Sequence, residues 1–237
     1  MSLSATKPSV GIIVQARMGS SRLPGKIFKP LFDGESILGF LLKRLRQCKL
    51  PDRLVVATTT NPKDDLLVCW LAENDMDLYR GSEEDCLNRF TQTGKHFGFE
   101  LVVRITSDCP LIVPEVVDEM VDYYLENRDR IDYLSNRQYT NFPEGLDVEI
   151  FTQKMLEMAE KKARKKQERE HINYYFLDRP TEFRIRYFTH TLGRDYSRFK
   201  LSIDTQEDLG RLRHLFENKG LPAQFTLNQL FSVLDES

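Results

Sequence analysis

Residues 10–26 read VGIIVQARMGSSRLPGK, and this stretch decides the fold class. It opens with the apolar run Val10–Val14, which is typical of a β-strand covered on both faces. The segment Gln15–Lys26 follows at once and holds two glycines, two arginines and a lysine. A buried strand that ends in such a loop predicts an α/β sheet with an anion-binding loop at the carboxyl end of its first strand.

Strand and helix patterns alternate over the first half of the chain. Further buried strands are predicted where apolar and β-branched side chains gather, at residues 53–60, 77–80 and 100–106. Helices are predicted to open at residues that cap or start helices, which are Ser36, Asn61, Ser82 and Pro114. This order predicts a mixed, mostly parallel sheet flanked by helices.

The pattern changes after residue 130. Four more strands are predicted, at residues 132–135, 147–151, 183–190 and 199–203. A charged helical stretch at about residues 153–177 separates the second from the third, which indicates an insertion with antiparallel character. Thr205 and Thr226 are expected to cap two last helices. We expect a single domain over residues 1–237, with halves at 9–130 and 131–210 and C-terminal helices in 211–237.

Composition excludes several classes of protein. The formal net charge is −2, so no global field attracts nucleic acid or a membrane surface. The four cysteines form no CxxC pair, which argues against a zinc site and for a reducing compartment. Residues 1–9 lack an apolar signal core, and no apolar run approaches the roughly 18 residues of a membrane-spanning helix. We therefore expect a cytoplasmic protein that binds neither nucleic acid nor membrane.

The loop after the first strand has the chemistry of a polyphosphate site. Glycine allows close approach of the backbone to an anion, Arg17 and Arg22 offer forked donors, and Lys26 adds a point charge. The loop is not a Walker A motif, because five residues separate its two glycines and Ile27 replaces the Ser or Thr that binds Mg²⁺. The GxGxxG fingerprint is also absent, which argues against NAD and FAD. A surface turn with unrelated basic side chains is the alternative.

Carboxylates stand where a metal for such a ligand would be needed. Asp108 and Asp204 each follow a predicted strand, and Mg²⁺ prefers carboxylate oxygens together with phosphate. Both have a simpler reading, in which Asp108 satisfies the N–H groups of a turn and Asp204 or Thr205 caps a helix. Asp147 and Glu149 share one face of a predicted strand by the two-residue period, so they either face solvent or line a sugar pocket.

Taken together, these segments resemble the CMP-sugar cytidylyltransferase family, of the spore coat polysaccharide biosynthesis type. CMP-Kdo and CMP-sialic acid synthetases are more distant relatives. The matching segments come in family order, at residues 15–26 (QARMGSSRLPGK), 80–82 (RGS), 104–111 (RITSDCPL), 145–149 (GLDVE), 168–171 (EREH) and 203–209 (IDTQEDL). The chain departs from many relatives at Gln206, where they have proline. It departs from CMP-sialic acid synthetases at Ser202, where they place a second aspartate.

The resemblance implies a GT-A-like nucleotidyltransferase fold, Rossmann-like in its parallel strands. It implies transfer of CMP from CTP to an acidic or amino sugar, with Mg²⁺ as cofactor and pyrophosphate as product. Residues 9–130 would bind the nucleotide and residues 131–210 the acceptor sugar. Members of the family are often dimers, so the resemblance, and not any residue pattern, points to a homodimer.

The resemblance also implies roles for individual residues. Catalytic roles fall on Arg17, Lys26, Asp108 and Asp204, the two aspartates being the Mg²⁺ ligands. Contacts to the nucleotide are expected from Ala16, Arg17, Met18, Gly19, Arg22, Lys26, Gly81, Ser82 and Arg104. Contacts to the acceptor sugar are expected from Asn136, Asp147, Glu149 and His171.

Several alternatives stay open at the level of sequence. His171 is either a catalytic base or a histidine held by neighbouring carboxylates. The basic run Lys161–Lys166 suggests nucleic-acid binding, but acidic residues flank it and a solvated helix face explains it better. A GT-A glycosyltransferase with a nucleotide-sugar donor would not need a basic loop for departing pyrophosphate. A non-catalytic nucleotide-binding protein on the same fold is the remaining possibility.

Overall fold

The computed structural model describes residues 7–236, so the expectation for the start of the chain lies outside the described residues. The strands are β1 (Val10–Gln15), β2 (Pro30–Phe32), β3 (Glu35–Ser36), β4 (Arg53–Thr59), β5 (Asp77–Gly81), β6 (Leu101–Thr106), β7 (Tyr133–Ser135), β8 (Glu149–Thr152) and β9 (Ile185–Tyr187). The α-helices are α1 (Ile37–Leu45), α2 (Asp65–Glu73), α3 (Cys86–Phe97), α4 (Pro114–Glu126), α5 (Gln153–Lys162), α6 (Lys166–Glu170), α7 (Ile172–Leu177), α8 (Gln206–Glu217) and α9 (Leu227–Asp235). Two short 3₁₀ turns are η1 (Lys26–Phe28) and η2 (Pro62–Asp64).

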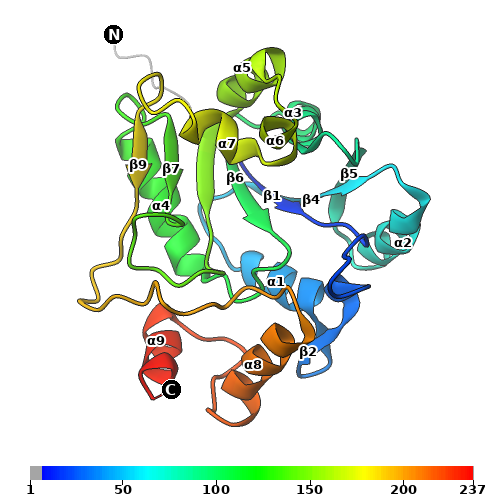
Figure 1. Ribbon diagram of the computed structural model, residues 1–237, viewed down its shortest axis with the longest axis vertical. Helices are drawn as coiled ribbons and strands as arrows, with labels where there is room; N and C mark the ends of the chain where they lie inside the picture. The colour runs from blue at the N-terminus through cyan, green and yellow to red at the C-terminus, as the bar shows by residue number, and fades with distance from the viewer. Residues whose placement is uncertain (1–6, 237) are drawn as a thin grey trace.

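A seven-stranded sheet in the order β5-β4-β1-β6-β8-β7-β9 runs through the molecule (Figure 1). The strands β5, β4, β1 and β6 are parallel, whereas β8 pairs antiparallel with both β6 and β7. The edge strand β9 is parallel to β7. The structure therefore confirms the mostly parallel sheet and the antiparallel insertion after residue 130.

The two faces of the sheet carry separate hydrophobic clusters. Ile12 and Val14 pack on the face covered by α1, α2, α4, α8 and α9, whereas Ile13 packs on the face covered by α3, α5 and α7. Figure 1 shows α3, α5, α6 and α7 gathered on one side of the sheet and α1 and α8 on the other. Alternate burial on both faces explains why β1 reads as an unbroken apolar run.

One predicted strand is absent. Residues 199–203 form no strand in the described chain, and a single bridge joins Lys200 to Glu144. The Leu201 N–H donates to the Glu144 carbonyl, whereas the Ile203 N–H donates to the Asp108 carbonyl. Because these bonds reach two different loops, no continuous ladder forms, and the segment crosses the end of the sheet instead.

Other boundaries differ from the prediction for local reasons. The helical stretch at 153–177 is broken into α5, α6 and α7, because the Glu168 carboxylate accepts from the Arg164 and Lys165 N–H groups and starts a new helix. Ser82 accepts from the Asp85 N–H in a turn, and Asp85 is the residue that caps α3. The predicted caps Ser36, Asn61, Thr205 and Thr226 are confirmed. Among residues 7–236, no helix is long and apolar enough to cross a membrane.

Candidate active site

Apolar residues hold the loop between β1 and η1 in shape. Leu23 and Ile27 are buried in the core. Gly25 adopts a φ of 64°, a left-handed conformation that suits glycine, and η1 begins immediately after it. These anchors leave Arg17 and Arg22 exposed at the carboxyl end of β1.

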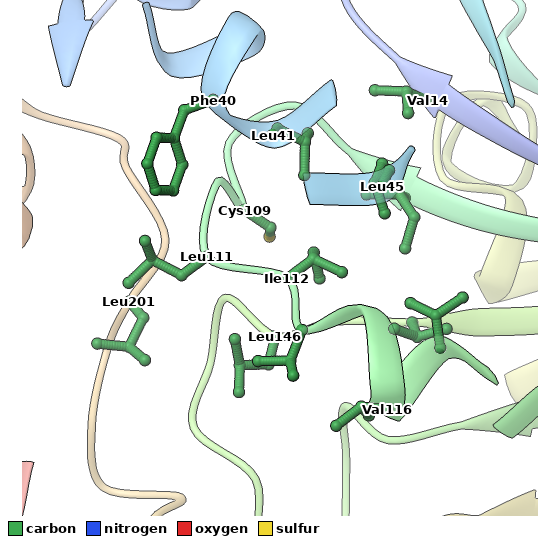
Figure 2. Close-up of a cluster of buried hydrophobic side chains, with 14 of the residues drawn as sticks. Val14, Phe40, Leu41, Leu45, Cys109, Leu111, Ile112, Val116, Leu146 and Leu201 are labelled. Carbon is green, nitrogen blue, oxygen red and sulfur yellow. The ribbon is translucent and has the colours of Figure 1, made fainter. Parts of the chain in front are cut away.

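The segment after β6 places Asp108 at the same end of the sheet. Figure 2 shows Cys109, Leu111 and Ile112 among the hydrophobic side chains beside Leu41 of α1. All three are buried. Because its neighbours are fixed in the core, Asp108 is held with about a third of its side chain exposed to the cavity described below.

Asp204 reaches the same point, because it directly follows residues 199–203, the crossing segment. Its carboxylate lies 2.9 Å from Arg22 Nη2 and 3.2 Å from Lys200 Nζ. Thr205 provides the cap of α8, because its hydroxyl accepts from the Asp208 N–H at 3.2 Å. Of the two residues that the capping alternative named, Thr205 is thus the cap, and the carboxylate of Asp204 contacts Arg22 in the loop after β1.

Lys26 bridges the two aspartates. Its Nζ lies 3.7 Å from Asp108 Oδ2 and 3.9 Å from Asp204 Oδ1, and it donates to the Ile203 carbonyl at 2.7 Å. Burial alone would raise the pKa of Asp108, but the charge of Lys26 and a hydrogen bond from Thr106 outweigh burial and hold that pKa below its usual range. Residues 26, 108 and 204, far apart in sequence, thus meet around one ammonium group.

The described residues contain no cluster of three or more His, Cys, Asp and Glu side chains that could hold a metal by themselves. Asp108 and Asp204 therefore offer two carboxylates and leave the other coordination positions to substrate and water. Such a set of hard oxygen ligands could hold Mg²⁺, which is commonly bound by one or two carboxylates together with phosphate oxygens.

Asp147 lies in the loop before β8 and not in a strand, so it does not share a strand face with Glu149 as predicted. Its carboxylate is 3.4 Å from Arg137 Nε and accepts from the Gly145 N–H at 3.4 Å. Burial raises the pKa of Asp147 to about 6, and the charge of Glu149 adds to this rise, although Arg137 opposes it. The loop thus presents a carboxyl group with a pKa well above that of an ordinary aspartate.

Glu149 and Arg104 form a buried ion pair, with only 4% and 6% of their side chains exposed. The solvent-facing alternative for Glu149 is therefore wrong. Asn136 is 1% exposed, and its carboxamide donates to the Leu146 carbonyl and accepts from the Val148 N–H, both at 2.8 Å. Because both ends of this carboxamide are used by the backbone, Asn136 belongs to the frame of the site and not to its cavity.

A cavity of about 460 Å³ opens above these groups. Ten of the residues expected to bind substrate or metal line it, namely Arg17, Gly19, Arg22, Lys26, Arg104, Asp108, Asp147, Glu149, His171 and Asp204. Five others do not line it, namely Ala16, Met18, Gly81, Ser82 and Asn136. The structure thus gathers residues from both halves of the chain around one cavity.

A second cavity of about 500 Å³ adjoins the first. The two share Gln15, Arg17 and His171, and the second is also lined by Glu83, Glu84, Cys86, Arg89, Lys166 and Glu170. His171 is exposed, and in the described part of the chain it forms no ion pair with a carboxylate. It is therefore not held in the way that the simpler alternative supposed.

Comparisons with known proteins show the family of the chain. A family model described as cytidylyltransferase matches residues 11–230. The chain belongs to the cytidylyltransferase family.

The chain is similar to a solved cytidylyltransferase from Leptospira borgpetersenii, at 38% identity and a TM-score of 0.89, over 97% of this chain and 95% of the other. It is also similar to the spore coat polysaccharide biosynthesis protein SpsF of Bacillus subtilis, at 29% identity over 95% of this chain and 93% of that protein. A CTP complex of CMP:2-keto-3-deoxy-manno-octonic acid synthetase shares the fold, at 15% identity and a TM-score of 0.66, over 88% of this chain and 98% of the other. The sheet and its flanking helices thus form the α/β nucleotidyltransferase fold of cytidylyltransferases.

No individual role was predicted from the sequence for three side chains at this site, which are Gln15, Arg137 and Lys200. Gln15 ends β1 and Arg137 comes two residues after β7, so both stand near strand ends. Lys200 precedes Asp204 by four residues and pairs with it. Strand ends at the ligand-binding edge were the available signal for Gln15 and Arg137, whereas nothing in the sequence distinguishes Lys200 from other surface lysines.

Proposed function

We propose that the protein transfers CMP from CTP to a hydroxyl group of an acidic or amino sugar and releases pyrophosphate, for the synthesis of a surface polysaccharide. The observation that supports this most is the meeting of Asp108 and Asp204 at Lys26, beside the basic loop after β1. The similarity to SpsF supports the pathway. The four unpaired cysteines are consistent with a reducing cytoplasm.

In this proposal Arg17, Arg22 and Lys26 hold the triphosphate. Arg22 and Lys26 already contact the aspartates, so binding of the triphosphate would transfer their charge from the carboxylates to the phosphates. Asp108 and Asp204 would then be free to hold Mg²⁺. When bound, Mg²⁺ supplies charge neutralisation at the phosphates and fixes their orientation.

The acceptor sugar lies on the Asp147 and Arg137 side of the cavity. Its hydroxyl oxygen attacks the α-phosphorus of CTP in line with the departing oxygen of pyrophosphate, and the bond between the α-phosphorus and that oxygen breaks. Arg17, Arg22 and Lys26 stabilise the negative charge that develops on the pyrophosphate. The hydroxyl proton leaves to the carboxylate of Asp147 or to water.

Release of pyrophosphate, measured with CTP and a panel of acidic and amino sugars, tests this proposal. The Asp108→Asn variant should lose on the order of 10²–10³ in turnover, because one carboxylate of the metal pair becomes neutral. Asp195→Asn, in an exposed loop, is the matched control and should retain full turnover.

Three outcomes would contradict the proposal. Normal turnover of Asp108→Asn at saturating Mg²⁺ would remove the metal assignment. Transfer of the sugar from a nucleotide-sugar donor to an acceptor, without any release of pyrophosphate from CTP, would instead identify a glycosyltransferase. Binding of CTP without turnover on any sugar would indicate a non-catalytic nucleotide-binding protein.

A further inference from the structure

A buried charged network forms part of the wall of the first cavity. Arg104 of β6 faces Glu149 of β8 across the antiparallel register, and its Nη1 donates to one oxygen of that carboxylate. The hydroxyl of Tyr133 donates to the other oxygen. Burial and the charge of Glu149 raise the pKa of Tyr133 well above its usual range, so its hydroxyl stays protonated and remains a donor.

The network ends on Gln15. The Nη2 atom of Arg104 lies 3.3 Å from Gln15 Oε1. A guanidinium group only donates hydrogen bonds, so the end of the carboxamide that faces it must be the carbonyl oxygen. The amide N–H₂ group of Gln15 therefore points away from Arg104, and it makes no hydrogen bond with any residue in the range 7–236.

Gln15 lies at the junction of the two cavities. Arg17, two residues later, lines both as well, so a nucleotide whose phosphates contact Arg17 lies within the cavities that Gln15 also lines. A pyrimidine such as cytosine carries two acceptors on one edge, O2 and N3. A fixed N–H donor at the junction is suited to reading that edge.

Stability alone does not explain the network. Burying an ion pair costs desolvation free energy, and well-packed hydrophobic side chains commonly replace such a pair without loss of stability. What hydrophobic side chains could not do is fix which end of the Gln15 carboxamide faces the cavity. A carboxamide without a partner could present either its oxygen or its nitrogen.

We propose that Gln15 donates a hydrogen bond from Nε2 to the pyrimidine of CTP, and that Arg104, Glu149 and Tyr133 are positioning residues that fix this orientation. The inference rests on the proposed use of CTP. It assigns Arg104 and Glu149 a positioning role instead of the direct contacts expected from sequence. Gln15 is the side chain that touches the substrate.

Titration calorimetry of CTP with Mg²⁺, without any acceptor sugar, tests the role of Gln15. Gln15→Ala should weaken CTP binding by about 3- to 10-fold, because one hydrogen bond is lost. Gln15→Glu keeps an oxygen toward Arg104 but replaces the donor with an acceptor, so it should weaken binding by roughly 10- to 100-fold. Gln47→Ala, whose side chain bonds the Lys43 carbonyl on the surface, is the control and should bind as the parent does.

A double-mutant cycle tests the positioning residues. Glu149→Gln should weaken CTP binding in the parent but cause no further loss in the Gln15→Ala background, because the side chain that it orients is then absent. Equal losses in both backgrounds would show a merely structural role and overturn the proposal. If Glu149→Gln does not fold, Tyr133→Phe removes only one hydroxyl from the same network and takes its place in the cycle.

The remaining outcomes separate this inference from the proposed function. If the parent binds CTP and Gln15→Ala binds it equally well, the inference fails and the proposed function stands. An unchanged affinity for CTP with a raised KM for an acceptor sugar would place Gln15 on the sugar and also overturn the inference. If the parent itself binds no CTP with Mg²⁺, the proposed function fails first.

Discussion

The fold disfavours the charged form of the Asp147 carboxyl group. Burial raises its pKa to about 6, against 3.8 for an ordinary aspartate. The folded state therefore holds the proton more tightly than the unfolded chain does, and stability falls as the pH rises from about 4 to about 6. Above that range this group causes no further change. A shift of this size corresponds to about 3 kcal/mol.

Replacing Asp147 by asparagine should remove this cost. We expect Asp147→Asn to be more stable than the parent by about 2–3 kcal/mol at pH 8, with a difference that shrinks as the pH falls from 6 to 4. Urea unfolding at several pH values measures this. Glu73→Gln, at an exposed position in α2, is the control for loss of a surface carboxylate. A variant less stable than the parent at pH 8 would show that the Arg137 contact outweighs burial.

At the scale of elements, one close backbone contact connects the loop before β8 to the crossing segment. Gly145 has a φ of 101°, and a Cβ atom there would lie 2.4 Å from the backbone of Leu201 and Ser202. Leu201 is buried beside Leu146 and Leu111, as Figure 2 shows. The absence of a side chain at Gly145 thus lets the segment that carries Asp204 approach the loop that carries Asp147.

Gly145→Ala should therefore separate two parts of the site. We expect a loss of about 2–4 kcal/mol in unfolding free energy and a large loss of turnover, because backbone atoms and not a flexible side chain must move. Gly210→Ala is the matched control, because Gly210 lies inside α8 and a Cβ atom there would meet no atom from elsewhere in the described chain within 4 Å. The control should be as stable as the parent or more stable by up to about 1 kcal/mol. Equal behaviour of the two variants would contradict this account.

At the scale of the whole molecule, the site joins three separate parts of the chain. These are the loop after β1, the end of β6 and the crossing segment before α8. A ligand that contacts all three should therefore stabilise the entire fold and not one part of it. CTP with Mg²⁺ at 100 times its dissociation constant should add about 2.7 kcal/mol of stability. For a chain of this length the melting temperature should rise by about 5–10 °C in a single transition.

Differential scanning fluorimetry measures this shift. CTP with EDTA should produce a smaller rise, because Asp108 and Asp204 then keep their negative charge beside the phosphates. An equal rise with and without Mg²⁺ would argue against the metal assignment. Two separate transitions, of which one responds to CTP, would show that the two halves unfold independently.

Much of the fold could be predicted from local patterns. Val10–Val14 and residues 100–106 are apolar runs that a parallel sheet requires, and caps such as Ser36 and Thr205 mark helix starts by their own side chains. The pattern failed at residues 199–203, which have the composition of a strand but no neighbouring strand to complete a ladder. The shared strand face of Asp147 and Glu149 was wrong because Asp147 lies outside β8, and the two-residue period also does not show what covers a strand face.

The sequence by itself determined the order of strands and helices, the basic loop after β1 and the family, because these depend on residues that are close in the chain. Only the tertiary structure decided that Lys26 lies between Asp108 and Asp204, and that Arg104 turns the carboxamide of Gln15. These contacts depend on packing across the carboxyl ends of β1 and β6 and on the path of the crossing segment. The partners in ion pairs and hydrogen bonds are set by distances in space, which local sequence patterns do not contain.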